Sequence, residues 1–230
     1  MNSYLTVSHL SAFYGSLTAV REVSTSFDQG SRTGIFGHNG SGKSTFLKCL
    51  VGGVKSVSGA VCFRDHQIEP NLVHRNVRLG IAVVPQSRNV FPNLSVKQCQ
   101  NIAGLRSGSQ DHDAVFALLP LLADRRRQIA GSMSGGEQQM LAVGMALMTR
   151  PEVMLLDEPT AGLSPVAARD VLALLKSINE RLGTTIIMVE QNVLAALDIV
   201  ERALVLRSGE IVYDGRSEAL GNKEDLWKLF

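Results

Sequence analysis

The sequence predicts an α/β fold in which a parallel sheet is covered by helices on both faces. Short apolar, β-branched runs alternate with helical patterns, and these runs are apolar at successive positions rather than at every second one. A β-rich layer precedes this core and a helical insertion interrupts it. The 230 residues suffice for one such domain, with residues 1–86 and 134–230 in the core and about residues 87–133 in a helical subdomain.

The elements before the insertion follow from turn residues and apolar spacing. Leu5 to Phe27 holds apolar runs on both sides of Tyr14-Gly15-Ser16, which predicts antiparallel strands joined by a turn. Arg32 to Phe36 is predicted as a short buried strand, and a helix follows Lys43, with apolar residues at helical spacing: Phe46, Leu47, Leu50 and Val51. Ile81 to Val84 is predicted as a buried strand stopped by Pro85.

The insertion is predicted to be helical. Its apolar residues have helical spacing, with breaks around Gly108 and Pro120; they are Leu94, Val96, Ile102, Leu105, Val115, Leu118, Leu119 and Leu122. A helix is predicted from Glu137 to Met148, and a strand from Val153 to Leu156.

The last third of the chain is predicted as a helix, a strand and a hairpin. The helix starts with Ser164 as N-cap and Pro165 at its first position, and it ends at Gly183. Thr184 to Val189 is an apolar, β-branched strand, and a terminal hairpin follows with strands over Ala203–Leu206 and Ile211–Tyr213.

The composition excludes several classes of protein. Hydrophobic residues make up 45% and charged residues 19%, which argues against disorder. A net charge of +2 is too small to imply nucleic-acid binding, and Arg125-Arg126-Arg127 is interpreted as a solvated helix end or loop. The three cysteines form no C-x-x-C pair and are expected to be small buried hydrophobes in a reducing compartment.

No targeting or membrane-spanning pattern is visible. Met1 to Tyr4 lacks the basic patch and apolar stretch of a signal peptide. No apolar run approaches the roughly 18 residues that span a bilayer. The chain is expected to be soluble, so that any membrane role requires a partner.

A glycine-rich segment indicates phosphate binding. Gly37-His38-Asn39-Gly40-Ser41-Gly42-Lys43-Ser44 matches G-x-x-x-x-G-K-[ST] between a predicted strand and a predicted helix. Glycines let the backbone fold around an anion, while its N–H groups and the helix N-terminus supply partial positive charge. Lys43 is expected to reach the β- and γ-phosphates, and the Ser44 hydroxyl to coordinate Mg²⁺. The segment therefore predicts a P-loop, and the chain is expected to hydrolyse ATP.

Two acids end the strand after Val153. Asp157 lies where ligands bind in open α/β sheets, and its carboxylate is expected to hold the Mg²⁺ hydration shell. Glu158 is expected to act as general base on the water that attacks the γ-phosphorus. The alternative for Glu158 is a solvated loop acid.

Ser134-Gly135-Gly136-Glu137-Gln138 allows two interpretations. Ser134 and Glu137 match a capping box at a helix start. Two glycines in a helical turn cost about 1 kcal/mol each, which is explained if a phosphate must approach that backbone closely. One chain with two phosphate sites and one P-loop predicts a head-to-tail dimer that encloses two ATP molecules.

These motifs together resemble the ATP-binding cassette (ABC) ATPase subunits of transporters over essentially the whole chain. The resemblance implies the ABC ATPase fold, with Ser134 to Gln138 as the signature motif, in which Met133 replaces the usual Leu and Glu137 the commoner Gln. It implies that Gln86 contacts Mg²⁺ and that Tyr14 stacks on adenine, although Tyr14 taken alone favours a packed strand residue. The nucleotide-binding candidates are Tyr14, Gly37, Asn39, Gly40, Ser41, Gly42, Lys43, Ser44, Thr45, Gln86, Ser134, Gly135, Gly136 and Glu137. The metal candidates are Ser44, Gln86 and Asp157, and the catalytic candidates are Lys43, Glu158 and Gln191.

Two positions depart from the family pattern. Ser164 follows Ala161-Gly162-Leu163 where the family usually has Asp, and Gln191 stands at the switch position that is usually His. A neutral amide can still donate to the γ-phosphate, although a charge-assisted hydrogen bond is about twice as strong. We therefore hypothesise that Gln191 performs the switch role without a protonation step.

Gln191 at the switch position also indicates which branch of the family the chain resembles. Val189-Glu190-Gln191-Asn192, Gly162 to Pro165 and Ser134 to Leu141 resemble one ATPase subunit of importers for branched-chain amino acids, urea or amides, although that branch often has Glu at the position of Gln86. This implies a second ATPase, identical or paralogous, two transmembrane permeases near Gln86 and Asn89 to Pro92, and an extracytoplasmic solute-binding protein. It also implies a peripheral place on the cytoplasmic face of the inner membrane.

Other function classes remain open. The ATPase of an exporter or lipid extractor shares every motif except the Gln191 signal. A soluble ABC protein that acts on DNA or ribosomes usually fuses two cassettes or inserts a coiled coil. A regulatory module without turnover is disfavoured by the intact Glu158. The transported solute touches other subunits, so this sequence does not name it.

Overall fold

The computed structural model describes residues 4–105, 108 and 112–220, so Met1 to Ser3, part of the segment examined for a signal peptide, lie outside it. Within this part, the larger sheet has six strands in the order β10-β9-β3-β8-β7-β6. All neighbours are parallel except β9 and β10, which form a hairpin. The strands are β3 (Arg32–Phe36), β6 (Ile81–Val84), β7 (Val153–Asp157), β8 (Thr185–Val189), β9 (Arg202–Arg207) and β10 (Glu210–Arg216). The predicted parallel sheet and terminal hairpin are confirmed.

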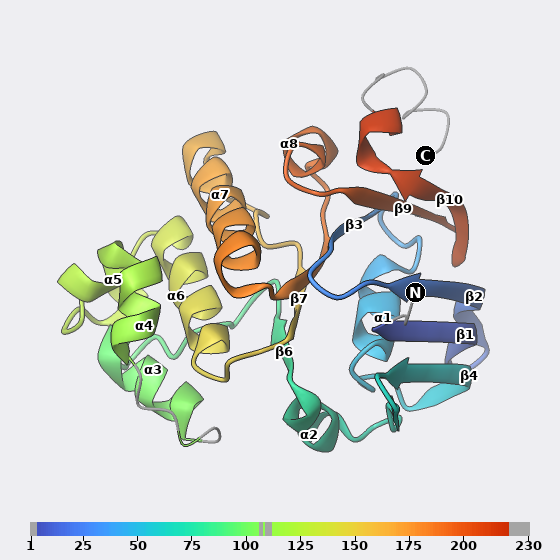
Figure 1. Ribbon diagram of the computed structural model, residues 1–230, viewed down its shortest axis with the longest axis horizontal. Helices are drawn as coiled ribbons and strands as arrows, with labels where there is room; N and C mark the ends of the chain where they lie inside the picture. The colour runs from blue at the N-terminus through green and yellow to red at the C-terminus, as the bar shows by residue number, and fades with distance from the viewer. Residues whose placement is uncertain (1–3, 106–107, 109–111, 221–230) are drawn as a thin grey trace.

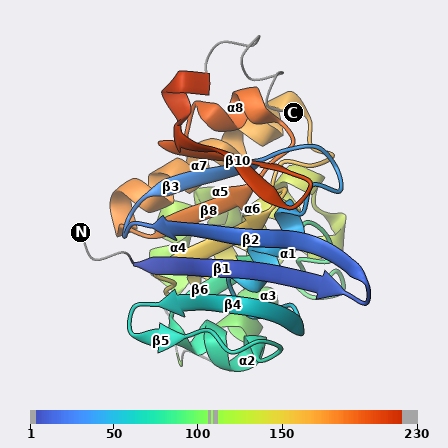
Figure 2. The same cartoon turned by 90° about the vertical axis from the view of Figure 1, so that its right-hand side faces the viewer.

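A smaller antiparallel sheet lies across α1 from the first and has the order β2-β1-β4-β5 (Figure 2). Its strands are β1 (Leu5–Tyr14), β2 (Leu17–Phe27), β4 (Ser56–Phe63) and β5 (His66–Gln67). The sequence predicted the first two and missed β4, because its exposed positions do not alternate and a register shift interrupts its pairing with β1. At this shift Gly59 adopts φ +80°, and a Cβ there would lie 2.2 Å from the carbonyl oxygen of His9.

The helices cover the parallel sheet on both faces (Figure 1). α1 (Lys43–Cys49) packs between the two sheets, whereas α6 (Gly135–Leu147), α7 (Pro165–Leu182) and α8 (Val193–Leu197) lie on the other face. Three helices of the insertion lie beyond α6, namely α3 (Val96–Gly104), α4 (His112–Leu118) and α5 (Pro120–Asp124). The short α2 (Val73–Asn76) precedes β6, and 3₁₀ turns span Val77–Leu79, Ala130–Ser132 and Ser217–Leu220.

Two apolar cores result from this layering. One lies between the two sheets and around α1, with Phe27, Phe46 and Phe63 almost fully buried. The other joins the parallel sheet to α6 and α7 and extends to α3–α5. This second apolar core continues from the sheet into the insertion without a break. The predicted boundary between the core domain and the helical subdomain therefore stays a prediction.

Three details differ from the prediction. The helix predicted from Glu137 starts at Gly135, so both signature glycines lie in its first turn. Val83 was expected to be buried but is exposed, since β6 is an edge strand of the sheet. Arg125 and Arg126 are not simply solvated: Arg125 forms an ion pair with Glu137, and the Arg126 guanidinium lies 4.2 Å from the ring centroid of Phe116.

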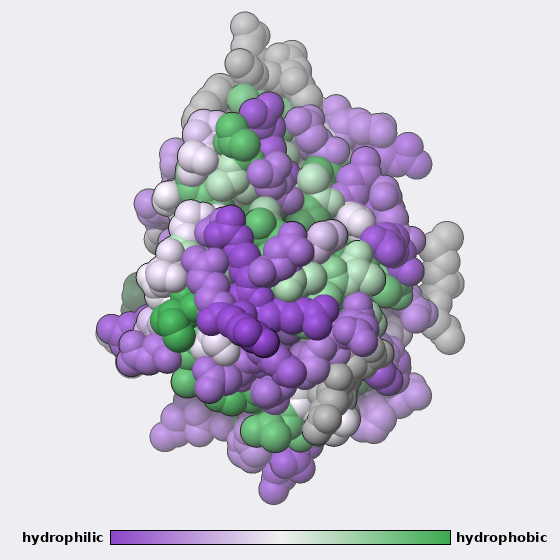
Figure 3. Space-filling view, turned by 90° about the vertical axis from the view of Figure 1, so that its left-hand side faces the viewer, coloured by the Kyte–Doolittle hydropathy of each residue, from purple (hydrophilic) through white to green (hydrophobic). Residues whose placement is uncertain are grey.

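The face formed by the insertion is largely hydrophilic, with apolar side chains scattered among polar ones (Figure 3). Across the described ranges, every helix is too short or too polar to cross a bilayer.

Candidate active site

The glycine-rich segment forms a cradle at the carboxyl end of β3. Gly37, Gly40 and Gly42 have φ values of +143°, +80° and +102°, a region that side chains rarely adopt. A Cβ at Gly37 would lie 2.2 Å from the carbonyl oxygen of Leu206, and one at Gly42 would lie 2.3 Å from that of Ala19. At Gly40 there is open space. Two glycines are thus required by packing, and the third borders a hollow of about 270 Å³ lined by residues 38–41 and 206–208.

Lys43 at the start of α1 folds its ammonium back onto the loop. Its Nζ donates to the carbonyl oxygens of Gly37 at 2.8 Å and His38 at 2.9 Å, and the residue is 5% exposed. Burial lowers the pKa of Lys43, while the nearby carboxylates of Glu158 and Asp157 oppose that shift. The lysine is held in place by acceptors that an anion can replace.

Two further groups make the cradle fit a phosphate. The Ser41 Oγ is buried and has no hydrogen-bond partner in the described structure. The Ser44 Oγ donates to Asp157 Oδ1 at 2.8 Å, which brings together two of the three predicted metal ligands, one from α1 and one from β7. Thr45 follows in the first turn of α1.

Glu158 lies between two amides. Gln86 Nε2 donates to Glu158 Oε2 at 2.6 Å, and Gln191 Nε2 donates to Oε1 at 2.8 Å. The same Gln191 nitrogen donates to Asn39 Oδ1 at 3.1 Å, which links the switch position to the cradle. Glu158 has φ +49° and is 8% exposed, so it is not a solvated loop acid. A strained backbone that persists at a buried carboxylate is typical of functional sites.

The signature segment caps α6. Ser134 Oγ accepts from the backbone N–H of Glu137, whose carboxylate accepts from the N–H of Ser134 at 2.8 Å. Arg125, at the end of α5, holds the other oxygen of Glu137 at 2.9 Å. The capping box is therefore present. The structure does not bring this segment's groups into contact with the cradle residues.

The two signature glycines differ in their surroundings. A Cβ at Gly136 would lie 2.7 Å from the Cβ of Ala167 on α7, so helix packing already requires a glycine there. At Gly135 the nearest atom is the flexible Leu163 Cδ2, at 3.3 Å. Packing thus explains Gly136, and Gly135 remains available for a close approach to its backbone.

Tyr14 lies at the end of β1, in the β1–β2 hairpin, and is 50% exposed. It is therefore not the packed strand residue of the alternative interpretation. β2 reaches the cradle, because the Gly42 backbone approaches Ala19 closely.

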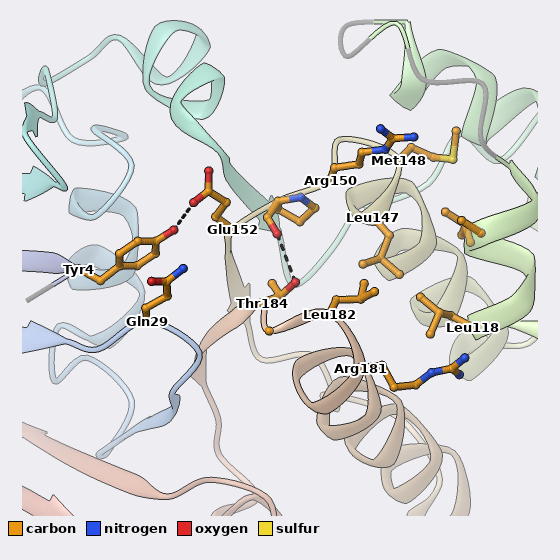
Figure 4. Close-up of a pocket in the computed structure, with 14 residues that line it drawn as sticks. Tyr4, Gln29, Leu118, Leu147, Met148, Arg150, Glu152, Arg181, Leu182 and Thr184 are labelled. Carbon is orange, nitrogen blue, oxygen red and sulfur yellow. Dashed lines mark hydrogen bonds between the residues drawn. The ribbon is translucent and has the colours of Figure 1, made fainter.

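A larger cavity than the hollow at the cradle lies away from this site. It has a volume of about 530 Å³ and lies among the ends of α6 and α7, α4 and Tyr4 (Figure 4). Pro151, Glu152 and Thr184 line it just ahead of β7 and β8, at the opposite end of the sheet from Asp157 and the cradle.

Sequence reasoning missed two residues. Arg125 was read as part of a solvated run, and nothing in the sequence pairs it with Glu137. Glu190 is a buried acid next to Gln191. Its position directly after a buried strand, like that of Asp157, was the available signal.

The geometry agrees with comparisons to known proteins. Residues 20–161 match the family described as ABC transporter. The branched-chain amino acid transport ATP-binding protein BraG of Pseudomonas aeruginosa is 38% identical over 94% of both chains. The probable branched-chain amino acid transport ATP-binding protein LivF of Archaeoglobus fulgidus is also 38% identical, over 96% of this chain and 95% of its own.

A solved ATP-binding cassette of an ABC transporter, in its ADP conformation, has the same fold. Its TM-score is 0.89 at 23% identity, with 100% of this chain and 98% of that chain covered. From the sequence motifs, the fold and these relatives, the chain belongs to the ABC transporter family and is an ATPase of that family.

Proposed function

We propose that this ATPase is the energy-coupling subunit of an importer for branched-chain amino acids or related small solutes such as urea or amides. The observation that carries the mechanism is Glu158 between the amides of Gln86 and Gln191, at the edge of the cradle. The solute class is supported by the 38% identity to two branched-chain amino acid transport proteins over nearly the whole chain.

The cradle binds the phosphates of ATP. Oxygens of the β- and γ-phosphates replace the carbonyls of Gly37 and His38 as partners of Lys43, and the Ser41 hydroxyl gains a partner. Asn39 and Thr45 complete the phosphate contacts, and Tyr14 stacks on the adenine, worth about 1–3 kcal/mol.

Mg²⁺ fits the donor set. Among the described residues, no group of three or more His, Cys, Asp or Glu side chains is placed to hold a metal. Mg²⁺ needs few protein ligands, because it is commonly bound by one or two oxygen side chains together with substrate phosphates. Ser44 and Asp157 supply a hydroxyl and a carboxylate 2.8 Å apart, and Gln86 bonds to Glu158, the residue after Asp157. When bound, the ion neutralises charge on the phosphates.

Glu158 serves as the general base. Its carboxylate accepts the proton of the water that attacks the γ-phosphorus, while Gln191 donates an amide hydrogen bond and orients that carboxylate. Because an amide does not titrate near neutral pH, the switch step requires no protonation.

The site is completed by a second ATPase subunit. The N-terminus of α6, with Ser134, Gly135, Gly136 and Glu137, then faces the nucleotide held by the partner's cradle. The partner is a second copy or a paralogue. Two permeases dock near Gln86 and Phe91, a half-exposed aromatic, and a solute-binding protein acts outside the membrane. The chain works on the cytoplasmic face of the inner membrane and binds no nucleic acid.

The test is a tagged purification of the full chain from gently solubilised membranes, with partners identified by mass spectrometry. Two permeases and a second, non-identical ATPase are the expected result. Phe91→Ser should lower permease recovery, whereas Leu182→Ser, which changes another exposed apolar side chain, at the end of α7, should not. Recovery of ribosomal or DNA-associated proteins alone would refute the transport function, and an exporter or lipid extractor as partner would refute the import direction.

A further inference from the structure

Glu190 is a buried acid that the mechanism above does not use. It follows β8 directly and is 2% exposed. It forms no ion pair with any described residue. Burial raises the pKa of its carboxyl, and hydrogen bonds from Thr160, Asn192 and Gln191 oppose the shift. An acid buried without a cation requires several good donors.

Those donors come from two separate loops. Glu190 Oε1 accepts from the backbone N–H of Thr160 at 2.8 Å. Glu190 Oε2 accepts from the N–H groups of Gln191 at 3.1 Å and Asn192 at 3.4 Å. Thr160 stands two residues after Glu158, so one carboxylate joins the loop of the general base to the loop of the switch amide.

The backbone on either side is anchored as well. The Glu190 N–H donates to the Ile35 carbonyl at 3.2 Å, next to the cradle, and the Glu158 N–H donates to the Val189 carbonyl at 2.9 Å. The two loops therefore follow neighbouring strands, β7 and β8. Just past the ends of these strands, the Glu190 carboxylate joins the backbones of the two loops.

We infer that Glu190 is a positioning residue for ATP hydrolysis: its carboxylate, bonded to the backbones of both loops, sets the distance between Gln191 and Glu158. The inference rests on the proposed roles of those two residues. Displacing catalytic groups by about 1 Å costs on the order of 10²-fold in rate, so the loss of this link should act on kcat rather than on nucleotide binding.

The first test measures the link directly, by hydrogen–deuterium exchange of the full chain. Glu190→Gln places an amide nitrogen, itself a donor, opposite a backbone N–H. Because this breaks the link, the amide exchange rates of residues 158–163 and of residues 190–192 should both rise, on the order of tenfold. The control is Glu201→Gln. It removes a carboxylate that pairs with Arg32 just ahead of β9, at the opposite end of the sheet from Glu190. Unchanged exchange at residues 158–163 would refute the link, whatever the roles of Glu158 and Gln191.

The second test separates a cross-loop link from a local turn. Glu190→Ser keeps a short acceptor for the N–H groups of its own loop but does not reach Thr160. Both Glu190→Gln and Glu190→Ser should lower kcat on the order of 10- to 100-fold, with the KM for ATP within about twofold. Adding Glu190→Gln to Gln191→Ala should lower kcat by less than it does in the native chain. Native kcat in the serine variant, or fully multiplicative losses, would overturn the inference.

Discussion

The cradle side (Gly37 to Ser44) and the signature side (Ser134 to Gln138, at the start of α6) both offer positive charge to a phosphate. Their polar groups, however, have different partners. In the cradle, Lys43 and Ser44 have partners that a ligand can replace, namely loop carbonyls and Asp157, and the Ser41 hydroxyl has no partner in the described structure. On the signature side, Ser134 and Glu137 close the end of α6 on itself, and Arg125 fixes Glu137 from outside.

The difference shows where binding energy is available. Exchanging one set of partners for another leaves few buried groups unsatisfied, so we expect the cradle to bind nucleotide within one chain. A capped helix end keeps only part of its field for a ligand, so we expect the signature side to contribute once a second subunit is present. Substitutions on the two sides should therefore separate hydrolysis, nucleotide binding and assembly.

The largest effect is expected at Glu158. Glu158→Gln removes the proton acceptor and should lower ATP turnover by about 10²- to 10⁴-fold, with nucleotide affinity nearly unchanged. Phosphate release and binding of a fluorescent nucleotide measure the two quantities. Glu180→Gln, on the exposed face of α7, is the control. Turnover within about threefold of native would show that Glu158 is not the base.

Lys43 should separate ligand binding from stability. Lys43→Met removes a buried ammonium whose pKa is lowered by burial, so the thermal midpoint without nucleotide should hold or rise. The stabilisation by ATP, about 2.7 kcal/mol at one hundred times Kd, should disappear. Differential scanning calorimetry measures both, with Lys48→Met on the exposed side of α1 as control. A preserved ATP shift in Lys43→Met would contradict the phosphate role.

The two signature glycines should respond in opposite ways. Gly136→Ala forces α6 and α7 apart and should lower the unfolding free energy by about 1–3 kcal/mol. Gly135→Ala needs only a shift of the Leu163 side chain, so it should keep stability and instead reduce turnover of the assembled ATPase. Urea unfolding and phosphate release distinguish them. Equal losses of stability would mean that packing explains both glycines.

Gln191 should give a smaller effect on rate. Gln191→Ala removes one hydrogen bond to the Glu158 carboxylate, worth about 1.5–3 kcal/mol, so turnover should fall about 10- to 100-fold. Gln191→His should retain activity and introduce a dependence on pH around 6.5 that the native chain lacks. Unchanged turnover in Gln191→Ala would refute the switch role.

Arg125 should give the smallest effect. Its ion pair with Glu137 is partly exposed, so Arg125→Ala should cost about 0.2–1 kcal/mol of stability, and less at high salt. Arg127→Ala in the same turn is the control. A larger loss would mean that this contact positions the signature helix itself.

Much of the fold could be predicted because it depends on local spacing. β3 and β6 were predicted with their observed bounds, and α7 with its caps Ser164 and Gly183, since each has an uninterrupted pattern between breakers. β4 could not be predicted, because its own residues have only a weak strand pattern. Its pairing with β1, a contact distant in sequence, keeps it in the sheet.

Residue type and spacing predict the chemistry: a phosphate cradle at Gly37 to Ser44, two acids after an apolar strand, and an amide at position 191. These features are local: each depends on a few neighbouring residues, whose types and spacing specify the loop, strand end or helix start that carries them. The folded chain alone reveals that Gln86 and Gln191 hold the two oxygens of Glu158, that Glu190 joins two loops, and that Gly136 packs on Ala167. These contacts join residues far apart in the chain, and the order of parallel strands in the sheet brings their ends together.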